Sequence, residues 1–227
     1  MKPIILSEKP LIRAYNCDCM KVMDGGRWDL AMIDPPYNVG ASNGSFGRGG
    51  KRAKNTRYRT ELKHYANHDV CPDKSFFDEL FRVSTNQIIW GANYYPQYLY
   101  HSGWIVWDKD KKDGLLSQAE LAFQSINKVV KIFKHEWEGF RKGPGSFETH
   151  DKKTIHPNQK PNALYVWSLL NYAKPGQTIL DTHGGSFSSA IACWKMGYDL
   201  DICELDEDYF KEACERFERE TRQQNLF

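Results

Sequence analysis

The chain contains, at positions 28–37, the stretch Trp28-Asp29-Leu30-Ala31-Met32-Ile33-Asp34-Pro35-Pro36-Tyr37, which decides its fold. The first six residues are mostly apolar and predict a short buried strand. Two consecutive prolines end it, because neither can donate to a sheet ladder. The turn therefore presents one carboxylate, two carbonyl oxygens and one aromatic ring, which suit a flat ring that carries an amine. By itself the tetrapeptide fits a plain strand-ending turn equally well.

Strand and helix patterns alternate through the rest of the chain. We expect strands at 11–15, 86–91, 104–107, 177–181 and 200–204, and helices after Asp73, at 94–100, at 162–173, at 188–196 and after Asp206. Two further strands, 119–123 and 128–133, are expected to form a hairpin. The alternation predicts an α/β fold with a doubly wound, mostly parallel sheet and an antiparallel edge hairpin. Ligands of such sheets gather at the carboxyl ends of the strands, where Asp34 and Asp181 are expected.

Length and composition set limits on the class of protein. The 227 residues are enough for one full α/β domain. No apolar run is long enough to span a bilayer, and the N-terminus lacks the layout of a signal peptide. The six cysteines are scattered and form no CxxC pair, which indicates neither a zinc site nor a disulfide framework. A cytoplasmic protein without a metal is therefore expected.

The charge is unevenly distributed although its formal sum is only +2. Basic residues crowd the segment 38–70, which is rich in Gly, Ser and Asn and has no apolar period. A second basic stretch lies between 139 and 155, whereas the stretch 199–220 is rich in acids. This asymmetry is typical of a protein that turns one face toward a polyanion. A solvated basic loop without a partner is the alternative.

A glycine turn follows the strand at 177–181. The turn Thr182-His183-Gly184-Gly185-Ser186 leads into a helix and then a strand that ends in Glu204, twenty-three residues after Asp181. Glycines allow close approach of a ligand, and an acid one βαβ unit later can bind ribose hydroxyls. Because the turn lacks the GxGxxG pattern that holds a pyrophosphate, it favours S-adenosylmethionine over NAD. Two structural glycines at a tight turn would give the same pattern.

The segment His156-Pro157-Asn158-Gln159-Lys160-Pro161 opens a helix. It offers backbone N–H groups and the ammonium of Lys160 to an anionic group such as a carboxylate. In isolation it is an ordinary helix start.

Together these three elements resemble the S-adenosylmethionine-dependent amino-methyltransferases of DNA in their β-type permuted order. The resemblance covers about residues 11–217 and includes Asn16-Cys17-Asp18-Cys19-Met20, which is similar to the turn that contacts the cofactor's adenine. It implies a Rossmann-like methyltransferase fold and one domain over residues 1–227, with a basic DNA-contacting insert at 38–70 and a second loop at 139–155. It implies S-adenosylmethionine as cofactor and double-stranded DNA as partner. A homodimer is compatible with it. The tetrapeptide with Asp in first place implies adenine N6 as the methylated atom.

The resemblance also assigns roles to residues. Asp34 and the carbonyl of Pro35 would each accept one hydrogen of the amino group, directing its lone pair at the sulfonium methyl. Tyr37 would stack on a base flipped out of the duplex. The catalytic set is Asp34, Pro35, Pro36 and Tyr37. The cofactor set is Asp18, Asp34, His156, Asn158, Gln159, Lys160, Asp181, Gly184, Gly185, Ser186, Glu204 and Leu205. The phosphate-binding set is Arg48, Lys51, Arg52, Lys54, Arg57 and Arg59.

The cofactor turn departs from the family pattern. Thr182 and His183 replace the usual Pro and Phe, and Phe187 stands where Gly is usual. These three replacements would be expected to lower the affinity of the turn for the cofactor. Alternative substrates are cytosine N4, RNA adenine or a protein glutamine, although glutamine enzymes carry Asn in place of Asp34. A nucleic-acid-binding protein with an inactive cofactor turn is the alternative from another class.

Overall fold

The computed structural model describes residues 2–37, 70–100, 102–110, 117–136, 155–156 and 158–222. The basic residues expected to bind phosphate, and the insert 38–70 apart from Val70, lie outside the described residues, as does the loop 139–155 apart from Ile155.

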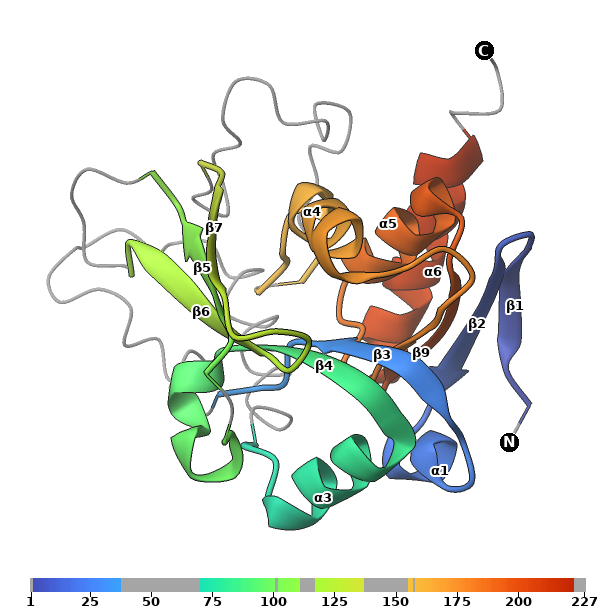
Figure 1. Cartoon of the computed structure of the whole chain (residues 1–227). Coiled ribbons are helices and arrows are strands. Elements are labelled where there is room, and N and C mark those ends of the chain that lie inside the picture. The colour runs from blue at the N-terminus through green and yellow to red at the C-terminus, as the bar shows by residue number, and fades with distance from the viewer. Residues whose placement is uncertain are drawn as a thin grey trace, which may run out of the picture.

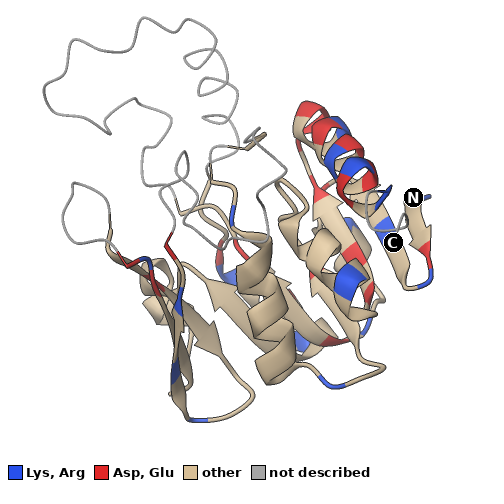
Figure 2. Ribbon diagram, turned by 90° about the horizontal axis from the view of Figure 1, so that it is seen from above, with Lys and Arg blue, Asp and Glu red and all other residues tan. Residues whose placement is uncertain are grey.

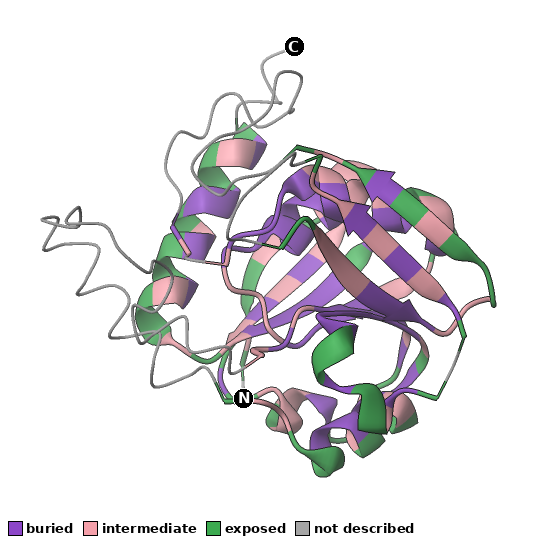
Figure 3. Cartoon of the chain, turned by 90° about the vertical axis from the view of Figure 1, so that its left-hand side faces the viewer, coloured by how far each residue is buried: buried purple, intermediate pink, exposed green. Residues whose placement is uncertain are grey.

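The described strands form one nine-stranded sheet in the order β1-β2-β9-β8-β3-β4-β6-β5-β7. Their bounds are β1 Ile4–Glu8, β2 Leu11–Asn16, β3 Trp28–Ile33, β4 Ser84–Trp90, β5 Trp104–Asp108, β6 Ala119–Gln124, β7 Val130–Lys134, β8 Thr178–Asp181 and β9 Asp199–Glu204. The five central strands β2, β9, β8, β3 and β4 are mutually parallel. The predicted parallel sheet is therefore confirmed, and its strands β3, β4, β8 and β9 are largely buried (Figure 3).

The predicted hairpin of 119–123 with 128–133 is wrong. β6 is antiparallel to β4 and β5, whereas β7 pairs with β5 in parallel, so β5 lies between the two predicted partners. The connection after β6 passes Gly103 at the start of β5, where a Cβ would lie 2.1 Å from the carbonyl oxygen of Asn127. The side chain of Gln124 holds this connection by donating to Asn127 and Val129 and by accepting from Ile126 and Asn127. An antiparallel edge hairpin does exist, but at the opposite edge, between β1 and β2.

Helices cover both faces of the sheet (Figure 1). One face carries α1 (Met20–Met23) and α3 (Lys74–Val83), and the other carries α4 (Asn162–Tyr172), α5 (Ser188–Met196) and α6 (Glu207–Arg222). Asp73 caps α3 as expected, because its side chain accepts from the backbone N–H groups of Ser75 and Phe76 at 2.9 and 3.3 Å. Among the described helices, none is long and apolar enough to cross a membrane.

The single aromatic helix expected at 94–100 is instead two short 3-10 turns, η2 (Ala92–Tyr94) and η3 (Pro96–Tyr98). Tyr95 separates them with φ −125° and ψ 33°, and Pro96 has no N–H with which to continue a helix. The turns begin at Gly91, whose φ of +67° favours glycine. The break places Tyr94 and Tyr95 next to the end of β3, which matters for the site below.

Among the three helices on the α4 face of the sheet, charge is concentrated on α6, whereas α4 and α5 carry almost none (Figure 2). The acids of α6 are partly neutralised along the helix by ion pairs such as Lys211 with Glu207 and Arg222 with Glu218. Such exposed pairs contribute little to stability. The acid-rich C-terminal stretch is therefore mainly the solvated outer face of one helix.

Candidate active site

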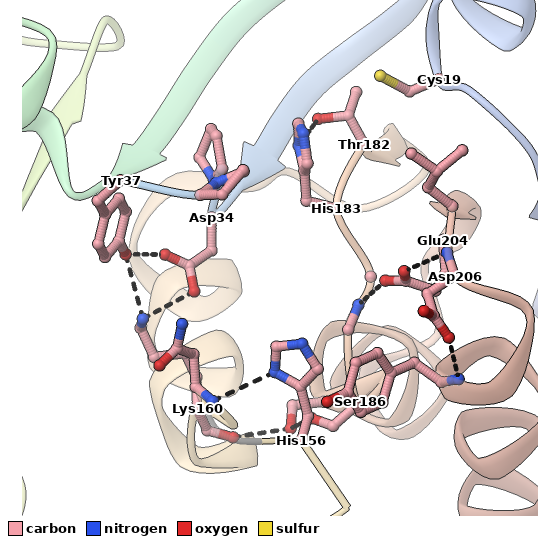
Figure 4. Close-up of a pocket in the computed structure, with 18 of the residues that line it drawn as sticks. Cys19, Asp34, Tyr37, His156, Lys160, Thr182, His183, Ser186, Glu204 and Asp206 are labelled. Carbon is pink, nitrogen blue, oxygen red and sulfur yellow. Dashed lines mark hydrogen bonds and ion pairs between the residues drawn. The ribbon is translucent and has the colours of Figure 1, made fainter. Parts of the chain in front are cut away.

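A cavity of about 290 Å³ lies at the carboxyl ends of the parallel strands. It is bounded by the segments that follow β2, β3, β8 and β9, and by the segment that leads into α4 (Figure 4). Asp34 and the glycine pair Gly184 and Gly185 line the same cavity. This is the position in which doubly wound sheets hold their ligands.

Most residues singled out from the sequence line this cavity. They are Asp18, Asp34, Pro35, Pro36, Tyr37, His156, Asn158, Lys160, Gly184, Gly185, Ser186, Glu204 and Leu205. Gln159 and Asp181 are not among the lining residues and lie buried behind it. Gln159 accepts from the N–H of Ile155 at 3.2 Å, and Asp181 accepts from the Ser189 hydroxyl at 2.5 Å and the N–H of His183 at 3.0 Å. These two residues therefore hold the walls of the cavity.

The carboxylate of Asp34 is almost completely enclosed. One oxygen lies 2.7 Å from Nζ of Lys160, and the other accepts a hydrogen bond from the hydroxyl of Tyr37. Lys160 in turn donates to that hydroxyl at 3.2 Å, so the three groups form a closed triangle (Figure 4). Burial raises the pKa of Asp34, and the ammonium of Lys160 partly offsets this increase.

Glu120 on β6 completes the charge cluster and was not expected from the sequence. Its carboxylate lies 3.2 Å from Nζ of Lys160 and 2.5 Å from Nζ of Lys109. Burial opposes ionisation of Glu120, but the two ammonium groups lower its pKa overall. The pKa of Lys160 is raised against the effect of burial by Asp34 and Glu120. A charged residue inside the otherwise apolar strand Ala119–Gln124 is the signal that could have identified it.

The ring of Tyr37 packs against neighbouring residues in this structure. It stacks on Tyr94 with centroids 4.9 Å apart and planes inclined by 11°, directly over Gly91. Tyr95, behind it, donates to the carbonyl oxygens of Pro35 and Pro36 at 3.1 and 2.5 Å. A carbonyl oxygen has two lone pairs, so that of Pro35 retains capacity for a second donor. Neither Tyr94 nor Tyr95 was identified from the sequence as part of the site.

The glycine turn is tied to the acid at the end of β9. The N–H of Gly185, whose φ is +51°, donates to Glu204 at 2.8 Å, and the second carboxylate oxygen of Glu204 accepts from the N–H of Asp206 at 2.9 Å. At Gly184 a Cβ would lie 2.7 Å from the ring of Phe187, so only glycine fits without displacement. Burial raises the pKa of Glu204 to about 7. A carboxylate in this position can accept the hydroxyl hydrogens of a ribose.

The unusual Phe187 now has a structural explanation. Its φ of +59° lies in the left-handed region, which accounts for a glycine being usual there. Its ring is fully buried and packs edge-on against Phe210 at 5.8 Å. Burial of a phenyl ring, worth roughly 2 kcal/mol, offsets backbone strain of about 1 kcal/mol.

The two histidines of the cavity are neutral at physiological pH. Burial lowers the pKa of His156 and of His183 to about 4. His156 accepts from the N–H of Asn158 at 3.2 Å, and His183 shares a hydrogen bond of 2.8 Å with the hydroxyl of Thr182. The side chains of Thr182 and His183 therefore meet each other's hydrogen-bonding needs, and the neutral imidazole adds no charge to the turn.

Arg216 clamps the turn from behind and was also missed from the sequence. Its guanidinium is fully buried and donates to the Ser186 carbonyl at 2.8 Å, the Ser188 hydroxyl at 2.9 Å and the Asn162 side chain at 3.2 Å. Its Nε pairs with Glu220 at 2.8 Å. A buried charge on the apolar face of α6, between Ala213 and Phe217, was the available signal.

The groups that line the cavity fit an adenosine-based cofactor. The cavity is lined by the acid Glu204, which could accept ribose hydroxyls, by the glycine turn at 184–185, and by a further acid, Asp18, just after β2. The described turn after β8 lacks the GxGxxG pattern that holds a pyrophosphate. Among the described side chains, no group of His, Cys, Asp or Glu is placed to hold a metal ion.

Comparisons with known proteins identify the family of the chain. The family model of the DNA methylases, which covers N6 and N4 methyltransferases, matches residues 57–215. Three solved structures share the fold. M1.HpyAVI, solved as a complex with S-adenosylmethionine, is 15% identical with a TM-score of 0.55 over 90% of this chain and 98% of that one. TTHA0409 from Thermus thermophilus, a putative DNA modification methylase, is 15% identical with a TM-score of 0.53 over 91% and 94%. The PvuII DNA methyltransferase, which is cytosine-N4-specific, is 12% identical with a TM-score of 0.60 over 96% and 88%. Since the family model spans more than half of the chain, the protein belongs to the DNA methylase family of S-adenosylmethionine-dependent amino-methyltransferases.

Proposed function

We propose that the protein transfers a methyl group from S-adenosylmethionine to N6 of an adenine flipped out of double-stranded DNA. The observation that carries this proposal is the position of Asp34 and the Pro35 carbonyl in the same cavity as Gly184 and Gly185. The form of the tetrapeptide, with Asp rather than Ser in first place, supports adenine.

Residues at the end of the cavity opposite Asp34 would hold the cofactor. Glu204 would accept the ribose hydroxyls, the backbone at Gly184 and Gly185 allows close approach, and Asp18 faces the same space. The bound cofactor supplies an electrophilic methyl group on a sulfonium. M1.HpyAVI, which shares the fold, was solved with S-adenosylmethionine.

The chain's own residues would activate the amino group. Its lone pair is delocalised into the ring, which makes it a poor nucleophile. Asp34 and the Pro35 carbonyl would each accept one amino hydrogen, and this positions the nitrogen and favours its pyramidal form. As the methyl group leaves the sulfonium for the nitrogen, Asp34, which already accepts an amino hydrogen, would take the proton that the nitrogen loses. Tyr37 would stack on the base.

Cytosine N4 is a second candidate, since the PvuII enzyme that shares this fold is cytosine-N4-specific. Cytosine carries the same amino group next to a ring nitrogen, so the Asp34 geometry accepts either base.

The test is to incubate unmethylated DNA with the protein and S-adenosylmethionine and then to map modified bases by long-read sequencing. N6-methyladenine is the expected product. N4-methylcytosine alone would establish the second candidate, and no modified base in DNA would contradict both.

Contact with DNA is assigned to the basic residues of the segment 38–70, which lies outside the described residues. Replacing four of them by Gln should flatten the salt dependence of DNA binding by roughly 3 to 4 in the slope of log K against log salt. An unchanged slope would remove the segment from the interface. The four are Arg48, Lys51, Arg52 and Lys54.

A further inference from the structure

The ammonium of Lys160 lies at the end of the cavity that contains Asp34. Its side chain is only 6% exposed, and its ammonium has three acceptors, namely Asp34 at 2.7 Å, Glu120 at 3.2 Å and the Tyr37 hydroxyl at 3.2 Å. In Figure 4 this ammonium lies beside Asp34 and Tyr37, on the opposite side of the cavity from Glu204 and Asp206. The sequence had indicated a role in binding the anionic group of the cofactor.

The Tyr37 hydroxyl marks what this end of the cavity recognises. It donates a hydrogen to Asp34 and accepts one from Lys160. An aromatic amine next to a ring nitrogen offers the same pair, because the amino group donates and the ring nitrogen accepts. The hydroxyl thus makes the same two hydrogen bonds that one edge of the base could make with Asp34 and Lys160.

We propose that Lys160 reads the target base by donating to the ring nitrogen next to the amino group, while Asp34 accepts an amino hydrogen. The Tyr37 hydroxyl satisfies both groups until the base enters. Glu120, fixed by Lys109, is a positioning residue that holds the ammonium of Lys160 against Asp34. This inference rests on the proposed function and deepens it.

Charge balance supports the arrangement. Asp34, Glu120, Lys160 and Lys109 together are neutral, and the side chains of all four are at most 22% exposed. Without Lys160, the effect of burial on Asp34 would be opposed by the hydrogen bond from Tyr37 alone among the described groups, and the pKa of Asp34 would rise. Glu120 acts in the opposite direction on Asp34, whose pKa it raises.

The decisive experiment uses short duplexes with the mapped target adenine replaced by 1-deazaadenine or 7-deazaadenine. Each analogue lacks one of the two ring nitrogens that flank the amino group. In the wild-type protein, one of the two should slow methyl transfer roughly 10- to 100-fold, as expected for loss of a hydrogen bond to a charged donor. In Lys160→Met the same analogue should change the rate less than threefold relative to adenine. A cytosine target would be tested in the same way with 3-deazacytosine.

A matched control is Lys131→Met, which removes an ammonium from β7 outside the cavity, where it contacts Asn171 at 2.8 Å. This variant should discriminate between the analogues as the wild type does. Equal responses of wild type and Lys160→Met would overturn the inference, and so would a tenfold loss of cofactor affinity in Lys160→Met with kcat preserved. No methyl transfer to DNA by the wild type would overturn the proposed function and this inference together.

The pH profile separates positioning from a merely structural role. The acid limb of kcat should move to higher pH in Lys160→Met and to lower pH in Glu120→Gln, because the two residues act on Asp34 in opposite directions. Equal shifts in both variants, or none, would overturn the role of Glu120. Among the described residues, the ionisable groups that interact with Asp34 are Lys160, Glu120, Tyr37, Tyr165 and Asp181.

Discussion

Replacing Arg216 by Met should destabilise the protein and weaken its cofactor turn. The side chain is fully buried and makes four hydrogen bonds, one of them to a carboxylate. Methionine fills similar space but leaves Glu220 and the Ser186 carbonyl without this donor. Breaking a buried pair by removing one partner costs about 3–5 kcal/mol. In a chain of this length, such a loss lowers Tm by roughly 6–20 °C.

The assay is thermal unfolding followed by circular dichroism, together with calorimetric titration of S-adenosylmethionine. The control is Arg222→Met on the same helix, where the arginine is 75% exposed and, among the described residues, pairs with the exposed Glu218. That variant should change stability by less than about 0.5 kcal/mol. Equal melting temperatures for the two variants would refute the claim that the buried contacts of Arg216 stabilise the fold. Cofactor affinity should fall in Arg216→Met alone, since only it releases the backbone of Ser186.

Two further predictions concern the ends of the cavity. Gly91→Ala would place a Cβ 2.0 Å from the ring of Tyr37, so kcat should fall about 100-fold with cofactor affinity unchanged. An unaltered kcat would show that the ring position is unimportant. The raised pKa of Glu204, about 7, means that its protonated form predominates below this value, so affinity for S-adenosylmethionine should fall from pH 8 to pH 6. Glu204→Gln should bind weakly but without this pH dependence, and a flat wild-type curve across the range would contradict the role of Glu204.

Burial decides which elements could be predicted from the sequence. β3 and β4 are covered on both faces, so their apolar runs were recognisable without knowledge of their neighbours. β1 was missed because Ile4 and Ile5 are about half exposed at the edge and show no alternation. The partner of β7 could not be predicted, since it depends on contacts around Gly103 and not on any local pattern.

The same distinction applies to the site. Residues in short motifs after strands, such as Asp34 and Glu204, were found because the ends of parallel strands converge on one edge. Glu120 and Arg216 were not, because each acts through a contact with a residue distant in the sequence. Their common signal is a charge inside an apolar pattern, which marks a buried partner without identifying it.

The central claim is that the Asp34 carboxylate binds the amino group which receives the methyl. The most direct measurement is single-turnover methyl transfer by Asp34→Ala, with the affinity for S-adenosylmethionine measured on the same preparation. We expect transfer to fall at least about 1,000-fold while affinity changes less than threefold. Transfer within tenfold of the wild type at intact cofactor affinity would contradict the claim.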